Sequence, residues 1–512
     1  MTTSDDTKVL VIGLDSFDPV LAQTWMDEGK LPHLAALMTA SVTGRVQNPH
    51  GLEAASVWSS FSYGADPGVH GMADGSRDRG KVLAGKDCAG APVVRPLWSI
   101  LEDAGRRSIV IEVPVVPDGA APTGIRVVNW FSHLPPEGSS RLALTTHPPE
   151  LRDIIARDYA GDPLDGRMCD FHQPRTAAEQ GWFRDALILR VRTKTALAID
   201  LMHREPWDFF LVVFEDSHCA AHHSAHLVAP SGEDARIAAQ IGNPLQTLYM
   251  AMDEAVGALV REAGGEATVL VFMSHGIEPA HTGLRLLDRI LAKLNGELDE
   301  ARNDTLTRAR DAWRALPAPL WRILRPLHSA IKQPLYGDGF LPASAGRKCH
   351  EVYTGERGSG IRINLAGRDP HGVIQPGAEY DAFCEWLIGE IGSVRNDGTG
   401  EKLAREIIRI RDHYTGPMSD TLPDLLVTWN RHAPIPSVSS PSIGRIRHPH
   451  PSIRTGDHSP DGFFLLAGPG FTPRRLNEDV PVIDLAPSLT ALFGVRSAAF
   501  QGHALEQLAP VR

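Results

Sequence analysis

Two histidines four residues apart are the first indication of chemistry in this chain. His218 and His222 follow the apolar segment Phe209–Phe214. A spacing of four places both imidazoles on one face of a helical turn, where they can bind the same metal ion. An isolated histidine is more often structural or solvated, so it is the spacing after a core strand that indicates metal binding.

Three more candidate ligands lie beside other apolar segments. Asp15 and His275 each follow such a segment, and His458 precedes one. Taken alone, Asp15 is more simply explained as a helix cap. Gly276 permits the sharp turn that would direct His275 across the end of a sheet. Because active sites of α/β proteins form beyond the carboxyl ends of parallel strands, we expect these side chains to lie together.

The elements that must position these residues follow an alternating pattern. Short apolar segments alternate with helical patterns, which predicts an α/β fold with a mostly parallel central sheet and helices on both faces. The expected strands are Val9–Leu14, Ser108–Val113, Phe209–Phe214, Thr268–Phe272, Leu425–Trp429 and Phe463–Ala467. The expected helices are Ala177–His203, Pro244–Ala263, Ala378–Ile391 and Ile483–Phe493. We expect Gly358–Gly377 to be a strand and turn that lead back to the core.

One long segment differs from this pattern. Residues 287–341 are rich in Arg, Leu and Ala at helical spacing and then in Pro, which predicts an inserted helical cap. A surface excursion without function is an equal alternative. The expected organisation is a first part of the core at 1–286, the cap at 287–341 and a second part of the core at 342–512.

Composition limits the classes of function. The 512 residues are 42% hydrophobic and 22% charged, as in ordinary soluble proteins, and the net charge of -11 provides no overall attraction for nucleic acid or an anionic membrane. The five cysteines form no CxxC pair, which argues against a thiolate zinc site or a disulfide framework. Met1–Thr7 does not resemble a signal peptide, and no apolar run approaches the roughly 20 residues of a membrane span. We therefore expect a cytoplasmic protein, with homo-oligomerisation left open.

A further segment, residues 53–72, carries a resemblance to a known family. The motifs Gly-Leu-Asp15, Ser-His275-Gly and Gly-Asp-His458 occur in the same order around it as in that family. The chain thus resembles the type I phosphodiesterase/nucleotide pyrophosphatase family of the alkaline phosphatase superfamily. The family pattern Trp-x-x-Phe-x-x-Gly-x-x-Pro-x-x-His-Gly is matched by Trp58, Phe61, Gly64, Pro67, His70 and Gly71.

The resemblance implies an alkaline phosphatase-like fold with a two-metal site for phosphoryl transfer. In such a site a Ser or Thr at a helix N-terminus is the nucleophile. By position, Asp15 and His275 correspond to ligands of the nucleophile-side metal, and His218, His222 and His458 to ligands of the other. The expected activity is that of a metal-dependent hydrolase or transferase acting on a small-molecule phosphate or sulfate ester, with zinc or, alternatively, manganese.

Three positions depart from the family pattern. His218 and Ser274 stand where the family usually has aspartates, and Ala54 stands at the nucleophile position, ten residues before Gly64. Three neutral imidazoles suit zinc, so we expect one tight metal site and leave the second open. Ser56 is the nearest replacement nucleophile, although serines there also cap or line a helix.

The missing hydroxyl leaves several alternatives. Water activated by the metal could attack in place of a side chain. The chain could instead be a degenerate family member that binds a phosphorylated ligand without turnover. An engineered inactivation at Ala54 is a third explanation that the sequence alone does not separate from the others.

Overall fold

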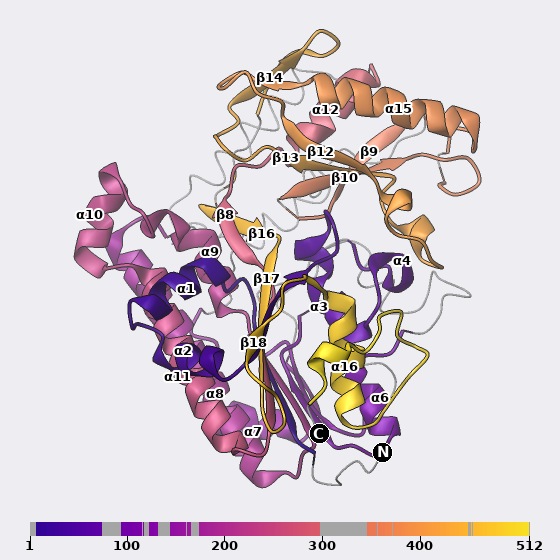
Figure 1. Cartoon of the computed structure of the whole chain (residues 1–512). Coiled ribbons are helices and arrows are strands. Elements are labelled where there is room, and N and C mark those ends of the chain that lie inside the picture. The colour runs from indigo at the N-terminus through magenta and orange to yellow at the C-terminus, as the bar shows by residue number, and fades with distance from the viewer. Residues whose placement is uncertain are drawn as a thin grey trace.

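The computed structural model describes residues 7–73, 94–114, 116, 122–131, 144–159, 161–164, 174–296, 346–355, 357–370, 372–448, 452 and 454–510 (Figure 1). Its larger part is built on a ten-stranded sheet. The strands are β1 (Val9–Leu14), β2 (Val42–Gln47), β3 (Ser108–Ile111), β4 (Ile125–Val128), β5 (Thr145–His147), β6 (Phe209–Phe214), β7 (Thr268–Met273), β17 (Asp461–Ala467), β18 (Arg474–Arg475) and β19 (Val480–Pro481).

The central sheet is mostly parallel, as the sequence predicts. Its order is β18-β2-β17-β7-β1-β6-β3-β4-β5, with β19 also beside β2. In the middle, β1 pairs in parallel with both β6 and β7. Only β17 and β5 run antiparallel to their neighbours among these strands. Within β1, Leu10 and Ile12 enter one hydrophobic core and Val9 and Val11 the other, because successive side chains of a strand point to opposite faces.

Helices cover both faces of this sheet (Figure 1). One face carries α1 (Pro19–Asp27), α2 (Pro32–Thr39), α7 (Leu151–Asp158), α8 (Ala177–Arg204) and α11 (Pro244–Ala263). The other carries α3 (Glu53–Tyr63), α6 (Leu97–Asp103) and α16 (Leu485–Leu492). Two short helices flank these layers, α4 (Pro67–His70) and α10 (Gly232–Ile241). Within the described residues, no helix combines the length and the apolarity needed to cross a membrane.

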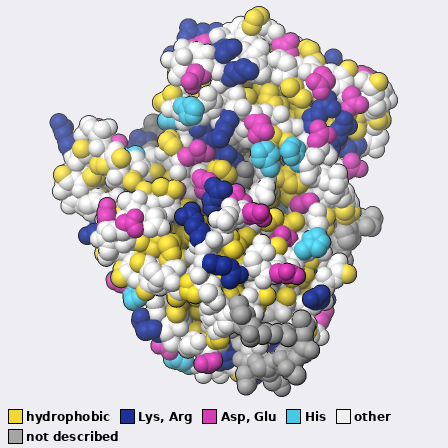
Figure 2. Space-filling view, viewed as in Figure 1, with side chains coloured by type: hydrophobic (Ala, Val, Ile, Leu, Met, Phe, Trp, Pro, Cys, Tyr) yellow, Lys and Arg dark blue, Asp and Glu magenta, His cyan; other side chains and the backbone are white. Residues whose placement is uncertain are grey.

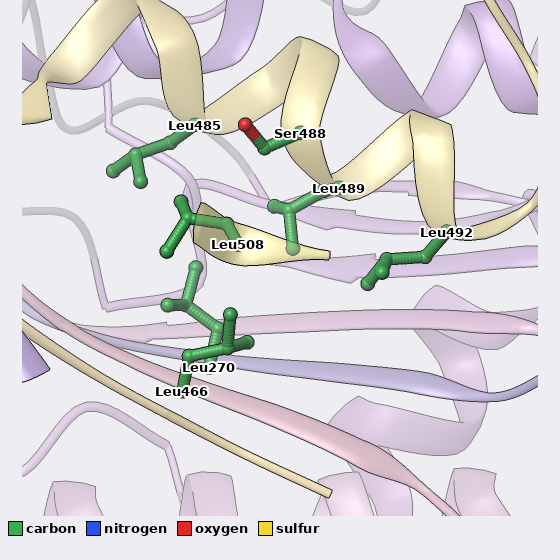
Figure 3. Close-up of a pocket in the computed structure, with 7 residues that line it drawn as sticks. All are labelled: Leu270, Leu466, Leu485, Ser488, Leu489, Leu492 and Leu508. Atoms are coloured by element: carbon green, nitrogen blue, oxygen red, sulfur yellow. The ribbon is translucent and has the colours of Figure 1, made fainter. Parts of the chain in front are cut away.

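Helix α16 shows how the second face is packed. Its leucines face the sheet, and the contact leaves only a small apolar pocket between them (Figure 3). The side chains that line this pocket are Leu270, Leu466, Leu485, Ser488, Leu489, Leu492 and Leu508. Six of these seven residues are leucines, so the pocket is a packing gap in the hydrophobic core and not a candidate site for a charged ligand.

Most of the remaining described residues form a second, smaller unit above the sheet in Figure 1. Its antiparallel sheet has the order β12-β13-β10-β9 and packs with α12 and α15 around a hydrophobic core of its own. A three-stranded sheet, β11-β14-β15, adjoins it. We call this unit, residues 286–294 and 349–447, the small lobe. Its elements are α12 (Leu286–Leu294), β9 (Cys349–Tyr353), β10 (Gly358–Ile363), α15 (Ala378–Ser393), β11 (Arg395–Asn396), β12 (Ala404–Arg409), β13 (Leu425–Trp429), β14 (Ser437–Ser440) and β15 (Gly444–Arg447).

Two predicted segments do not join the central sheet. Leu425–Trp429 is β13, and the strand predicted to lead back to the core is β10; both lie in the small lobe and pair antiparallel with each other. A strand buried on both faces has the same apolar sequence in either sheet, so the sequence does not distinguish them.

Most of the predicted cap lies outside the described residues, and the division at 287 and 341 stays a prediction. Figure 2 shows side chains of both charges mixed over one face of the molecule.

Candidate metal centre

The structure brings the predicted ligands together where β1, β6 and β7 end. Asp15 follows β1, and α9 (Asp216–Ser224), which carries His218 and His222, begins two residues after β6. His275 follows β7, and His458 lies in β16 (Gly456–Ser459), which pairs with β8 (Gly276–Pro279). The ring centres of His275 and His458 are 4.1 Å apart, and that of His218 is 4.6 Å from His458. We call these five side chains the histidine cluster.

Helix α9 places its two histidines as their spacing predicts. The Nε2 atoms of His218 and His222 are 2.9 Å apart. His223, one residue on, packs edge-on against Phe183 at a ring distance of 5.5 Å instead. Spacing of four along the helix thus decides which imidazoles meet.

Two hydrogen bonds determine how these imidazoles are oriented. His218 Nδ1 lies 2.9 Å from Asp15 Oδ2, and His222 Nδ1 lies 2.9 Å from the carbonyl oxygen of Gly456. Since both partners are acceptors, each Nδ1 carries the proton and donates it. Each Nε2 then turns toward the other imidazole. Two lone pairs at this distance repel each other unless a proton or a metal ion lies between them, so the arrangement fits a metal ion.

Asp15 is held by several donors. Its Oδ1 accepts hydrogen bonds from Trp58 Nε1 and Ser274 Oγ, both at 2.8 Å, and lies 3.5 Å from His275 Nε2. Burial alone would raise the pKa of this carboxyl, but His218, His275 and Trp58 outweigh it and hold the pKa well below its usual range. Asp15 is therefore an ionised carboxylate that orients His218.

The remaining imidazoles are favoured in the neutral form. Burial lowers the pKa of His222, His275 and His458 below the ordinary histidine value. His458 Nδ1 lies 3.2 Å from Ser16 Oγ. Neutral imidazoles are the form that binds a metal ion.

The predicted division into two ligand groups is not visible as two separate clusters. One set of ligand atoms, within 4.8 Å of one another, comes from His218, His275 and His458. A second comes from His222, His458 and Asp457. His458 belongs to both sets. Asp457 is not among the predicted ligands, although it lies in the Gly-Asp-His458 motif. Side chains of neighbouring strand residues normally point to opposite faces, so the motif alone does not indicate that both approach one site.

The segment at residues 53–72 anchors α3 to this cluster. Besides the bond from Trp58 to Asp15, the ring of Phe61 stacks on Phe272 of β7 at 5.1 Å. His70 bridges α3 and α4, since its Nε2 lies 2.9 Å from Ser60 Oγ and its Nδ1 accepts the backbone N–H of Met72 at 3.0 Å. Burial lowers the pKa of His70 to about 3, so it is a neutral structural link.

Sequence comparison agrees with these motifs. A model of the proteins described as type I phosphodiesterase / nucleotide pyrophosphatase matches residues 9–333. The chain belongs to the type I phosphodiesterase/nucleotide pyrophosphatase family. A comparison with curated protein sequences finds no match.

Solved structures of family members are similar over most of the chain. Murine ectonucleotide pyrophosphatase/phosphodiesterase 5, in an inactive form in complex with AMP, is 13% identical, with a TM-score of 0.46 over 98% of this chain and 97% of that one. The human protein is 14% identical, with a TM-score of 0.47 over 97% of both chains.

The family's nucleophile position has no hydroxyl here. Ala54 is the second residue of α3. The predicted substitute, Ser56, is buried, and its Oγ donates a hydrogen bond to the carbonyl oxygen of Leu52 at 2.7 Å. Among the described residues, no hydrogen bond joins Ser56 to the histidine cluster. Its role as nucleophile stays a prediction.

Two arginines, Arg362 and Arg368, are engaged in ion pairs inside the small lobe. Arg362 pairs with Asp369 at 3.0 Å, and Arg368 pairs with Asp424 at 2.7 Å. Arg357 lies 3.5 Å from Glu278 of β8, next to the strand ribbon that carries His458. The first two therefore serve the packing of the lobe.

Proposed function

We propose that this family member is a metal-dependent hydrolase or transferase acting on a small-molecule phosphate or sulfate mono- or diester, in the cytoplasm. The observation that carries the proposal is the pair of Nε2 atoms of His218 and His222, 2.9 Å apart with both Nδ1 atoms engaged by acceptors. Family membership supports the phosphoester as the substrate class. Sulfate is included because a sulfate ester presents a similar tetrahedral anion.

His218, His222 and His458 are the residues that would hold the ion. Nitrogen ligands of this kind favour zinc, with manganese as the alternative. A bound ion of this type polarises the phosphoryl group of the ester. Since the chain as a whole is acidic, this local positive charge is what would attract the substrate.

The chain's own residues supply orientation and shielding. Asp15 fixes the ring of His218 through Nδ1, and the Gly456 carbonyl fixes that of His222. The histidines are largely buried, which limits access of bulk water to the cluster and strengthens electrostatic interactions there.

A second candidate function is binding without turnover. The observation that favours it is the state of α3: Ala54 lacks a hydroxyl, and the Ser56 hydroxyl is used inside the helix. In this case the cluster would bind the anionic group of a phosphorylated ligand and leave it intact.

Metal-loaded protein should be tested with nitrophenyl phosphate mono- and diesters and a nitrophenyl sulfate, alongside His222→Ala. We expect turnover of at least one ester that this substitution abolishes. Binding of AMP or another phosphorylated probe without any turnover would favour the second candidate. No metal in the protein, even after supplementation with zinc or manganese, would contradict the metal-dependent proposal altogether.

A further inference from the structure

Asp457 is a buried carboxylate that the proposed function does not use. It lies in β16 between Gly456 and His458, and its side chain is fully buried. Among the described residues, neither of its oxygens has a hydrogen-bond partner. A buried carboxylate in this state is unfavourable unless a cation lies close to it.

Arg431 of the small lobe provides only part of that positive charge. Its Nη2 lies 3.2 Å from Asp457 Oδ2, yet the same atom donates a hydrogen bond to Pro279 O at 2.7 Å, and Nη1 donates to His458 O at 3.0 Å. The guanidinium thus makes its hydrogen bonds to backbone carbonyls and, through Nη1, to the carboxylate of Glu278 at 3.1 Å. The other oxygen of Asp457, Oδ1, lies toward the histidines, 3.8 Å from His458 Nε2.

Two imidazoles complete a ligand set with this oxygen. One ligand atom each from His222, Asp457 and His458 lies within 4.8 Å of the others. The Nδ1 of His222 is engaged by the Gly456 carbonyl, which leaves Nε2 as its ligand atom. Two histidines and one carboxylate are a ligand combination found in catalytic zinc sites.

Charge balance also favours this carboxylate. An imidazole that binds a metal ion brings no negative charge to it, and Asp15 is already engaged by Trp58, Ser274 and His218. We propose that Asp457 is a metal ligand and binds the ion together with His222 and His458. This inference rests on the metal dependence proposed above and adds a ligand to it.

Zinc affinity of the whole chain tests the inference. Asp457→Asn removes the charge at nearly constant shape, and we expect zinc to bind at least about 100-fold more weakly, beyond the range typical of losing an outer-shell partner. The matched control is Asp461→Asn, four residues on, whose carboxylate is exposed and accepts a hydrogen bond from Ser459 Oγ. The control should bind zinc like the unmodified chain. Competition with a chromogenic chelator measures all three proteins.

The melting temperature distinguishes a ligand from a purely structural partner of Arg431. If Asp457 is a ligand, zinc is expected to raise the melting temperature of Asp457→Asn by less than it raises that of the unmodified chain. Equal zinc affinity and an equal zinc-induced rise in Asp457→Asn, with only the metal-free protein less stable, would overturn the inference. Failure of the unmodified chain itself to bind zinc would instead contradict the proposed metal dependence.

A second variant covers the case in which Asp457→Asn does not fold. Asp457→Glu keeps the charge near Arg431 but moves the carboxylate by one methylene. With cobalt in place of zinc, we expect its visible absorption bands to shift relative to those of the unmodified chain, because a ligand has moved. Unchanged bands would show that position 457 does not bind the metal.

Discussion

At the scale of single residues, the hydrogen bond at one ring nitrogen decides what the other can do. Asp15 and the Gly456 carbonyl occupy the Nδ1 atoms of His218 and His222, and so both Nε2 atoms turn into the cluster. His223 is equally buried, but it packs against Phe183. Consecutive residues of a helix are rotated by about 100° about its axis. His222 therefore faces the histidine cluster, whereas His223 faces Phe183.

His222→Ala is expected to lose the tightly bound metal, with affinity reduced more than about 100-fold, because it removes a ligand and not merely an outer-shell partner. His223→Ala and His226→Ala are the controls and should retain it. Elemental analysis after dialysis measures the metal content of all three. If His223→Ala lost the metal and His222→Ala kept it, the assignment of ligands along α9 would be wrong.

At the scale of elements, α3 is fixed against the sheet close to Asp15. The ring of Trp58 lies so near β1 that a Cβ at Gly13 would clash with its Cη2 atom. The helix ends at Tyr63 and is capped by Gly64, whose φ of 56° is accessible to glycine at little cost. Trp58 and Phe61 thus hold the whole helix, and with it the first turn that contains Ala54.

Ala54→Thr is expected to raise hydrolysis of an activated phosphodiester by roughly an order of magnitude or more, because it restores a hydroxyl at the family's nucleophile position. The helix dipole at this end favours the developing negative charge. Ala54→Val, which has nearly the same shape but no hydroxyl, is the matched control and should give no increase. Initial rates with bis(nitrophenyl) phosphate compare the variants.

Ser56→Ala provides the counterpart on the unmodified chain. Since the Ser56 hydroxyl is bound to the Leu52 carbonyl, we expect any native activity to survive this substitution. Loss of activity in Ser56→Ala would identify Ser56 as the nucleophile and shift the family alignment by two residues.

At the scale of the whole molecule, the histidine cluster lies between two units with separate cores. Arg431 extends from the small lobe and donates to carbonyl oxygens of Pro279 and His458, one in each strand of the β8-β16 ribbon. The small lobe also contains a buried acid, Glu351, which accepts the backbone N–H groups of Arg285 and Asp288 at the start of α12.

The stability of the folded chain should therefore decrease as the pH rises from about 4.5 to about 8. Burial, with the nearby charge of Asp288, raises the pKa of Glu351 from 4.5 to about 8. Between these values the folded chain keeps a proton that the unfolded chain releases. This group's contribution to stability is complete below pH 4.5 and is lost as the pH rises to about 8, at most about 1.4 kcal/mol per pH unit.

Urea denaturation at pH 5, 6.5 and 8 measures this effect. Glu351→Gln, which cannot ionise, is expected to show a smaller loss of stability between pH 5 and pH 8 than the unmodified chain. Glu385→Gln, on the exposed side of α15, is the control and should behave like the unmodified chain. Equal pH dependence in all three proteins would contradict a proton held by Glu351.

The sequence by itself determined the central elements and the candidate ligands that lie beside them. β1, β6 and α11 begin and end as predicted, because apolar runs and helical periodicity are local signals. The spacing of His218 and His222 is local too, since it depends only on the geometry of one helix. The family pattern at residues 53–72 is likewise readable without a structure.

Only the tertiary structure decided which sheet each strand joins and which side chains meet. β13 has the apolar sequence of a central strand but pairs in the small lobe, because pairing depends on distant segments. Asp457 and Arg431 are 26 residues apart in sequence, and no local pattern indicates that they are neighbours. The use of the Ser56 hydroxyl and the orientation of His222 likewise follow from contacts that exist only in the folded chain.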